Sequence, residues 1–116
     1  MSGPTISSDP LYQLLRNDDV KGFNAAREEG QSCDLTGCDF KGSDLRGVNL
    51  KDTNLENAYF RGADLRGVDF RGCNLNGVSL ADAKISGCYF PPGLSPNEIQ
   101  LSVTHGTRMR QRFIKK

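Results

Sequence analysis

The stretch YFRGADLRGVDFRGCNLNG, which spans residues 59–77, decides how this chain of 116 residues folds. Within it a large apolar residue returns at every fifth position, at Phe60, Leu65, Phe70 and Leu75. An amphipathic helix needs apolar residues at a spacing of about 3.6, and a half-buried strand needs them at a spacing of 2. A period of five fits neither pattern and therefore indicates a repeat architecture.

The same period extends in both directions and gives twelve consecutive repeats. Each repeat has a small residue two positions before its apolar centre, and this separation places both side chains on one face of an extended segment. The last slot holds Gly in eight repeats and Asp52, Asn57 or Asp82 in three others, residues that tolerate a positive φ in tight turns. The predicted inward centres are Leu35, Phe40, Leu45, Leu50, Leu55, Phe60, Leu65, Phe70, Leu75, Leu80, Ile85 and Phe90.

Each pentapeptide is thus predicted to form a short extended edge followed by a corner. A chain of edges and corners that always turn the same way winds into a coil. One repeat can bury nothing by itself, so stability must come from the stacking of successive coils.

The units SDLRG, ADLRG and CNLNG resemble the A-(D/N)-L-X-X repeat of the pentapeptide-repeat proteins, and the resemblance covers residues 33 to 90. It implies a mainly β fold, a right-handed quadrilateral parallel β-helix with four repeats in each coil and about three coils in all. Residues twenty apart then share a face. We therefore expect two inner ladders, one of Phe40, Phe60 and Leu80, and one of Leu50, Phe70 and Phe90.

The remaining segments predict helical caps at both ends of a single domain, residues 1–116. Residues 9–30 form the N-terminal cap, in which Asp9 and Pro10 begin a helix and FNAAR at 23–27 resembles a WNxWR-like motif of the family. The repeats occupy residues 33–92. Residues 95–106 form a C-terminal helix with an SPNE capping box and Gly106 at its end. Residues 107–116 form a basic tail.

The residues give no support for an enzyme, a cofactor or a metal site. The four cysteines all occupy the small inward slot, where a buried structural thiol is expected, with ligand or redox roles as the alternative. The single histidine, His105, is expected at an exposed helix end. The outward carboxylates could suggest acid–base chemistry, but each lies next to a Lys or Arg slot, which favours a charge-balanced wall.

Charge decides between the functions that the resemblance implies. The best-known activity of the family is the modulation of type II topoisomerases such as DNA gyrase by members that mimic duplex DNA, which requires a long and strongly acidic rod. Residues 33–92 hold seven basic and eight acidic side chains. We therefore expect a protein-interaction scaffold with an unknown protein partner, whose basic ladders form the partner surface: Lys41 with Arg61, Arg46 with Arg66, and Lys51 with Arg71.

Other features of the sequence limit the partners further. Five of the last nine residues are basic, which is more typical of a solvated, disordered terminus than of a nucleic-acid or membrane contact, although the apolar residues among them could pack locally. No segment is long and apolar enough to span a membrane, and no signal peptide is recognisable. A cytoplasmic protein is expected, with homodimerisation possible and nucleic-acid binding disfavoured.

Overall fold

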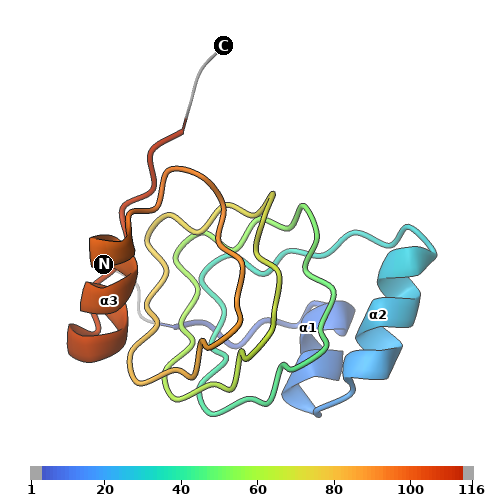
Figure 1. The fold of residues 1–116 in the computed structure, drawn as a ribbon. Helices are drawn as coiled ribbons and strands as arrows, with labels where there is room; N and C mark the ends of the chain where they lie inside the picture. The colour runs from blue at the N-terminus through green and yellow to red at the C-terminus, as the bar shows by residue number, and fades with distance from the viewer. Residues whose placement is uncertain (1–3, 114–116) are drawn as a thin grey trace.

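The structure, a computed structural model, describes residues 4–113. It contains helices α1 (Pro10–Arg16), α2 (Val20–Glu28) and α3 (Pro96–His105). Stacked coils lie between α2 and α3, with α1 and α2 at one end of the stack and α3 at the other (Figure 1). The described residues contain isolated parallel bridges and no continuous strand. The predicted β structure is therefore present only as bridges, because each extended edge soon gives way to a turn.

Hydrogen bonds between coils join residues that follow a twenty-residue register. Parallel bridges connect Asp44 with Asp64 and then Asp64 with Lys84, and the same offset recurs along the other sides. Leu45 N donates to Asp64 O at 3.0 Å, and Leu65 N donates to Lys84 O at 2.9 Å. Four repeats therefore complete one turn, and residues 33–52, 53–72 and 73–92 form the first, second and third coils.

The corners confirm the reading of the last slot of the repeat. Asp52, Asn57 and Asp82, which replace glycine there, have φ angles of 53°, 64° and 56°. This left-handed region is costly for most L-residues and is tolerated best by Gly, Asn and Asp. The chain can therefore turn sharply at these three corners without glycine.

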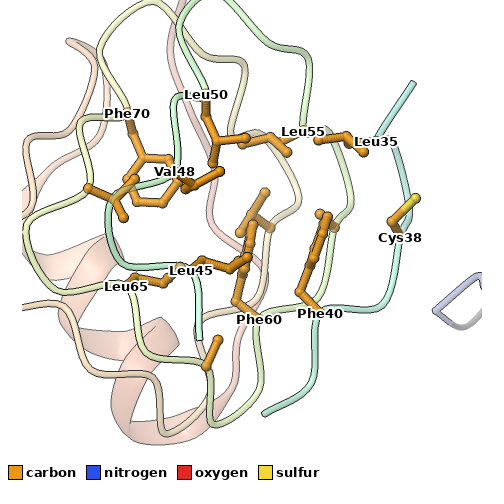
Figure 2. Close-up of a cluster of buried hydrophobic side chains, with 14 of the residues drawn as sticks. Leu35, Cys38, Phe40, Leu45, Val48, Leu50, Leu55, Phe60, Leu65 and Phe70 are labelled. Carbon is orange, nitrogen blue, oxygen red and sulfur yellow. The ribbon is translucent and has the colours of Figure 1, made fainter. Parts of the chain in front are cut away.

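The core lies inside the coils. Ten of the twelve predicted inward centres expose at most 2% of their surface, whereas Ile85 and Phe90, in the third coil, are only partly buried. Figure 2 shows the side chains of the first two coils pointing toward one another across the interior. The small slots contribute too, since Ala58, Ala63 and Val78 are fully buried.

Aromatic rings stack along the inner ladders. The rings of Phe40 and Phe60 lie 5.0 Å apart and nearly parallel, at 8°, as Figure 2 shows. On the opposite side Phe70 and Phe90 stack at 5.8 Å and 17°. Phe60 meets Phe70 edge-on at 6.2 Å, so the two ladders also contact each other across the core. Such pairs add about 0.5–1.5 kcal/mol each to the burial of their area.

Helix α1 covers the first coil at the N-terminal end of the stack. Asp9 caps it, since one carboxylate oxygen accepts from Leu11 N at 2.8 Å while the other accepts from Asp34 N at 3.0 Å. Tyr12 is fully buried, packs edge-on against Phe40 and donates its hydroxyl to Asp39 O at 2.6 Å. One carboxylate thus joins the helix start to the start of the repeats.

Helix α2 covers the neighbouring edge of the first coil with side chains. The Asn24 amide donates to Gly47 O at 3.0 Å and accepts from Asn49 N at 2.8 Å. Arg27 donates to Lys51 O at 3.0 Å. Asn24 therefore supplies a donor and an acceptor where a preceding coil would supply backbone groups, and both residues belong to the FNAAR motif.

The N-terminal segment adds a short edge that sequence reasoning did not predict. Thr5 pairs in parallel with Cys38, with Thr5 N donating to Gly37 O at 2.8 Å and Asp39 N donating to Thr5 O at 2.9 Å. Nothing in the pentapeptide pattern marks residues 4–9, which is why the pairing was missed.

At the other end, Ser95 caps the start of α3, since its hydroxyl accepts from Glu98 N at 3.2 Å, and Gly106, with φ 72°, caps its end. Only half of the predicted capping box forms, because the Glu98 carboxylate accepts instead from Arg110. Buried Ser102 accepts from Leu80 N at 2.8 Å, and Val103 O accepts from Asp82 N at 3.0 Å. Helix α3 thus covers one side of the third coil.

The prediction of a solvated basic tail is wrong for residues 107–112, whereas Phe113 is exposed. Arg108 pairs antiparallel with Ser79, and buried Met109 exchanges backbone bonds with the third coil, accepting from Gly77 N at 2.7 Å and donating to Val78 O at 2.9 Å. Gln111 Oε1 accepts from Leu75 N at 2.7 Å. The segment packs because it satisfies edge donors of the last coil. Residues 114–116 lie outside the described residues.

We predict that Leu65→Arg prevents folding, because Leu65 is fully buried in the middle coil and an arginine there would be an unpaired buried charge. Arg66→Ala, one position on and outward, should cost less than about 1 kcal/mol, as exposed ion pairs do. Circular dichroism and chemical unfolding compare the two variants. Equal losses of stability would contradict the assignment of inward and outward positions.

Asn24→Ala should lower the free energy of unfolding by about 1–2 kcal/mol, since it removes two hydrogen bonds to the edge of the first coil. Lys21→Ala, also on α2 and exposed, is the matched control and should change it by less than about 0.5 kcal/mol. Urea unfolding measures both. If the two variants were equally stable, the proposed edge-capping role of Asn24 would be wrong.

Candidate interaction surface

The outer wall of the coils is built from pairs of opposite charge. An aspartate before an inward centre and an arginine after it both point outward, since they are two apart on an extended segment. Arg46 donates to Asp44 through Nε at 2.9 Å and through a terminal nitrogen at 2.7 Å. The same two-point contact joins Arg66 to Asp64 and Arg71 to Asp69. The motif Asp-x-Arg is thus a self-contained ion pair at a corner.

Each aspartate in these pairs also accepts the backbone N–H of its arginine, at 2.9 Å for Asp69. The side-chain hydrogen bonds from Arg71 are the main reason why the pKa of Asp69 falls to about 2. The pKa values of Asp44 and Asp64 are lowered chiefly by Arg46 and Arg66 in the same way. These carboxylates therefore stay ionised at any physiological pH, which leaves them unsuited to proton transfer near neutrality.

The structure separates the predicted partner surface into two kinds of basic side chain. Arg46, Arg66 and Arg71 are held by carboxylates, and Arg46 also reaches Asp64 of the next coil at 3.4 Å. The other three predicted residues, Lys41, Lys51 and Arg61, are exposed and make no ion pair within residues 4–113. The Asp-x-Arg spacing was the signal in the sequence that could have predicted this division.

Two tyrosines on the outer wall lie under arginines. The Arg108 guanidinium is 5.0 Å from the centre of the Tyr59 ring and donates a hydrogen bond to its hydroxyl. The Arg71 guanidinium lies 4.6 Å from the centre of the Tyr89 ring, and Tyr89 is 56% exposed. The Tyr59 contact ties the C-terminal segment to the wall, whereas Tyr89 leaves much of its surface open.

The four cysteines are free thiols, two of them buried and two partly buried. Burial raises the pKa of Cys38 and of Cys73 to about 11, so both stay protonated and unreactive at neutral pH. Cys73 donates to Leu50 O at 3.0 Å and Cys88 donates to Leu65 O at 2.9 Å. These two thiols therefore act as hydrogen-bond donors to backbone carbonyls 23 residues earlier in the chain.

The described residues contain no group of His, Cys, Asp and Glu side chains that could hold a metal ion. His105 is the last residue of α3 and is exposed. None of the helices found in residues 4–113 is long and apolar enough to cross a membrane.

The shape of the molecule does not resemble a rod. Its principal extents are 34, 33 and 31 Å, so no direction is much longer than the others. Helices α1 and α2 cover one end of the coils and α3 with its following segment covers part of the other, as Figure 1 shows. The outer wall is thus a short surface bounded at both ends.

We predict that Arg71→Ala raises the pKa of Asp69 from about 2 toward the ordinary value of about 3.9, because the two-point hydrogen bond is lost. The carboxyl carbon of Asp69 can be followed by NMR from pH 1.5 to 7. Arg61→Ala is the control, because Arg61 makes no ion pair with Asp69, and should leave that titration unchanged. A titration of Asp69 that does not respond to Arg71→Ala would contradict the ion pair.

The repeat region of this chain is similar to known proteins. The family model described as "Pentapeptide repeats" matches residues 31–62 and 53–90, in eight copies. The chain is also similar to a solved structure, a pentapeptide repeat protein (Rfr23) from the cyanobacterium Cyanothece 51142, at 37% identity and a TM-score of 0.47. That match covers 49% of this chain and 39% of the other. No curated protein matches. Since the family model covers more than half of the sequence, the chain belongs to the pentapeptide-repeat family.

Proposed function

We propose that this chain is a non-enzymatic protein-interaction scaffold whose rigid outer wall binds a protein partner. The family implies that its coils form a right-handed, four-sided β-helix, and we adopt that winding as part of the proposal. The proposal is supported by the hydrogen-bonded stacking of the coils, which holds the wall in place, and by the ion pairs that fix Arg46, Arg66 and Arg71 on it.

The observation that carries the proposal is the column formed by Lys41 and Arg61. The two residues occupy equivalent positions in successive coils, and their side of the stack has backbone bridges that run from Thr5 at one end to Arg108 at the other. Their charges make no ion pair within the described residues, unlike those of Arg46, Arg66 and Arg71. An unpaired cation loses no existing partner on binding, so we propose an acidic patch of another protein as the partner.

A DNA-mimicking modulator of a type II topoisomerase is the alternative, and two observations oppose it. The coils carry nearly equal numbers of acidic and basic side chains. The molecule is about as wide as it is long. A nucleic-acid binder is also disfavoured, because three of the six ladder residues already neutralise carboxylates. We further propose that the protein acts in the cytoplasm.

The test is affinity capture from a native lysate at two salt concentrations, with mass spectrometry of the bound proteins. We expect the double variant Lys41→Glu/Arg61→Glu to lose a partner that the unchanged chain retains. The matched control Lys21→Glu/Arg112→Glu has the same change of charge on exposed residues outside the basic ladders and should keep it.

Other outcomes would contradict the proposal. Capture of topoisomerase subunits would favour the DNA-mimic alternative. Loss of the partner in both double variants would show binding through net charge rather than through the Lys41–Arg61 column, and retention of the partner in both would place the contact elsewhere.

A further inference from the structure

We propose that the uncovered side of the third coil, residues 83–90, is a docking edge for an extended segment of a partner protein. This proposal rests on the scaffold function and names a second contact for it. The partner's extended segment has apolar residues at two positions five apart and an acidic residue directly before the first of them. Four observations define this chemistry: the free backbone groups, the exposed ends of the inner ladders, the lysine at residue 84 in a column of aspartates, and the position of α3.

The third coil is covered along only half of its outer edge. Leu75 N donates to Gln111 Oε1 and Gly77 N donates to Met109 O, both at 2.7 Å. Leu80 N donates to Ser102 Oγ at 2.8 Å, and Asp82 N donates to Val103 O at 3.0 Å. These four N–H groups lie twenty residues after N–H groups of the second coil that bond to the third coil. Each of the four therefore has an acceptor, which α3 or the segment after it supplies.

The next three donors of the same kind have none. In the second coil, Leu65 N, Gly67 N and Phe70 N donate to carbonyl groups of the third coil at 2.7–3.0 Å. Their equivalents twenty residues on are Ile85 N, Gly87 N and Phe90 N, which make no hydrogen bond within residues 4–113. The carbonyls of Ala83 and Cys88 likewise accept none there. Such an edge is a template for an added backbone.

The apolar ladders also end open on this side. Ile85 and Phe90 are the two inward centres that are only partly buried, and Phe90 stacks on Phe70 with nothing comparable above it among the described aromatic rings. In the first two coils, each centre is covered by the centre twenty residues later in the chain. Neighbouring centres within a coil lie five residues apart. An incoming segment in the same register would therefore place two apolar side chains, five apart, over Ile85 and Phe90.

The charge at residue 84 adds specificity to that register. The column that begins with Asp44 and Asp64 continues with Lys84, through a bridge between Asp64 and Lys84. Both arginines beside Asp64 already bind it, and Lys84 forms no ion pair in the described part of the chain. The residue that lies over Lys84 comes directly before the first apolar position of the incoming segment. An acidic residue there would pair with the lysine.

The position of α3 determines the width of the occupant. Helix α3 and residues 107–112 already lie over the adjacent half of the coil, so another complete coil, such as the end of a second copy, would collide with them. A single extended segment fits beside α3 without moving it. We therefore infer that the occupant of this edge is a peptide segment of a partner rather than a second copy of this chain.

The experiment uses a labelled synthetic peptide, ADLRGVDFRG, which copies residues 63–72 and has the required acidic and apolar positions. Fluorescence anisotropy measures its binding to the full chain. We expect saturable binding, and at least a tenfold weaker affinity for ADSRGVDSRG, in which both apolar centres are replaced by serine.

Protein variants locate the site. Ile85→Pro removes one free edge N–H, while Lys84 keeps both its bonds to the second coil, Lys84 N to Ala63 O and Leu65 N to Lys84 O. We expect at least tenfold weaker binding for Ile85→Pro and nearly unchanged binding for the control Ile85→Val. Lys84→Glu should reverse the preference between the peptide and its Asp→Lys analogue at the second position. A thermal melt of each variant shows that it is folded.

The proposal is overturned by an absence of saturable binding at millimolar peptide, or by binding that Ile85→Pro does not weaken. It is also overturned if sedimentation shows a dimer that Ile85→Pro dissociates, because the occupant would then be a second copy. These failures are distinct from failure of the scaffold function. A partner that is lost in Lys41→Glu/Arg61→Glu while the peptide does not bind would leave the scaffold proposal intact and remove only the docking edge.

Discussion

The twenty-residue register of hydrogen bonds between coils is the constraint on which the rest of the structure depends. It places each inward centre over another, so that ten of them are almost completely buried although the sequence is poor in large apolar residues. It also places outward residues in columns, which brings Arg46 to Asp64 of the next coil. A slip by one repeat would separate the stacked phenylalanines and these cross-coil pairs together, so packing and surface charge favour the same register.

The two ends of the stack meet a second constraint, because the first and last coils have backbone groups without a coil beyond them. The chain covers these edges partly with backbone groups, such as those of Thr5 and Met109, and partly with side-chain amides and hydroxyls, such as Asn24 at one end and Gln111 and Ser102 at the other. An amide can replace a peptide group because it has both a donor and an acceptor. Covering is complete for one half of the last coil and absent for residues 83–90, and this asymmetry distinguishes a closed end from a docking edge.

Much of the interior could be predicted from the sequence, because a strict period of five specifies which side chains point inward and where the chain turns. Phe40 over Phe60, the positive φ of Asp52 and the helix ends at Asp9 and Gly106 all follow from local rules. The pairing of Thr5 and the docking of Met109 could not be predicted in this way. They depend on which edge donors remain unsatisfied, a property of the assembled coils, and neither segment has a repeat of its own.

The surface was harder to predict than the core for the same reason. Columns of Lys and Arg were visible in the sequence, but whether a cation is available depends on its distance from a carboxylate, which differs between Arg46 and Arg61 although their slots are equivalent. The repeat unit SDLRG contains its own counter-ion, whereas Arg61 has Tyr59 at the position of that aspartate. Lys41 has Asp39 at the same spacing, but only its backbone N–H bonds to that carboxylate.

The most direct test of the register is NMR detection of couplings across the hydrogen bonds between coils. The account predicts couplings from Leu45 N to the Asp64 carbonyl carbon and from Leu65 N to that of Lys84. Couplings from these amides to carbonyls offset by one pentapeptide in either direction, or no couplings across coils in a folded protein, would contradict it.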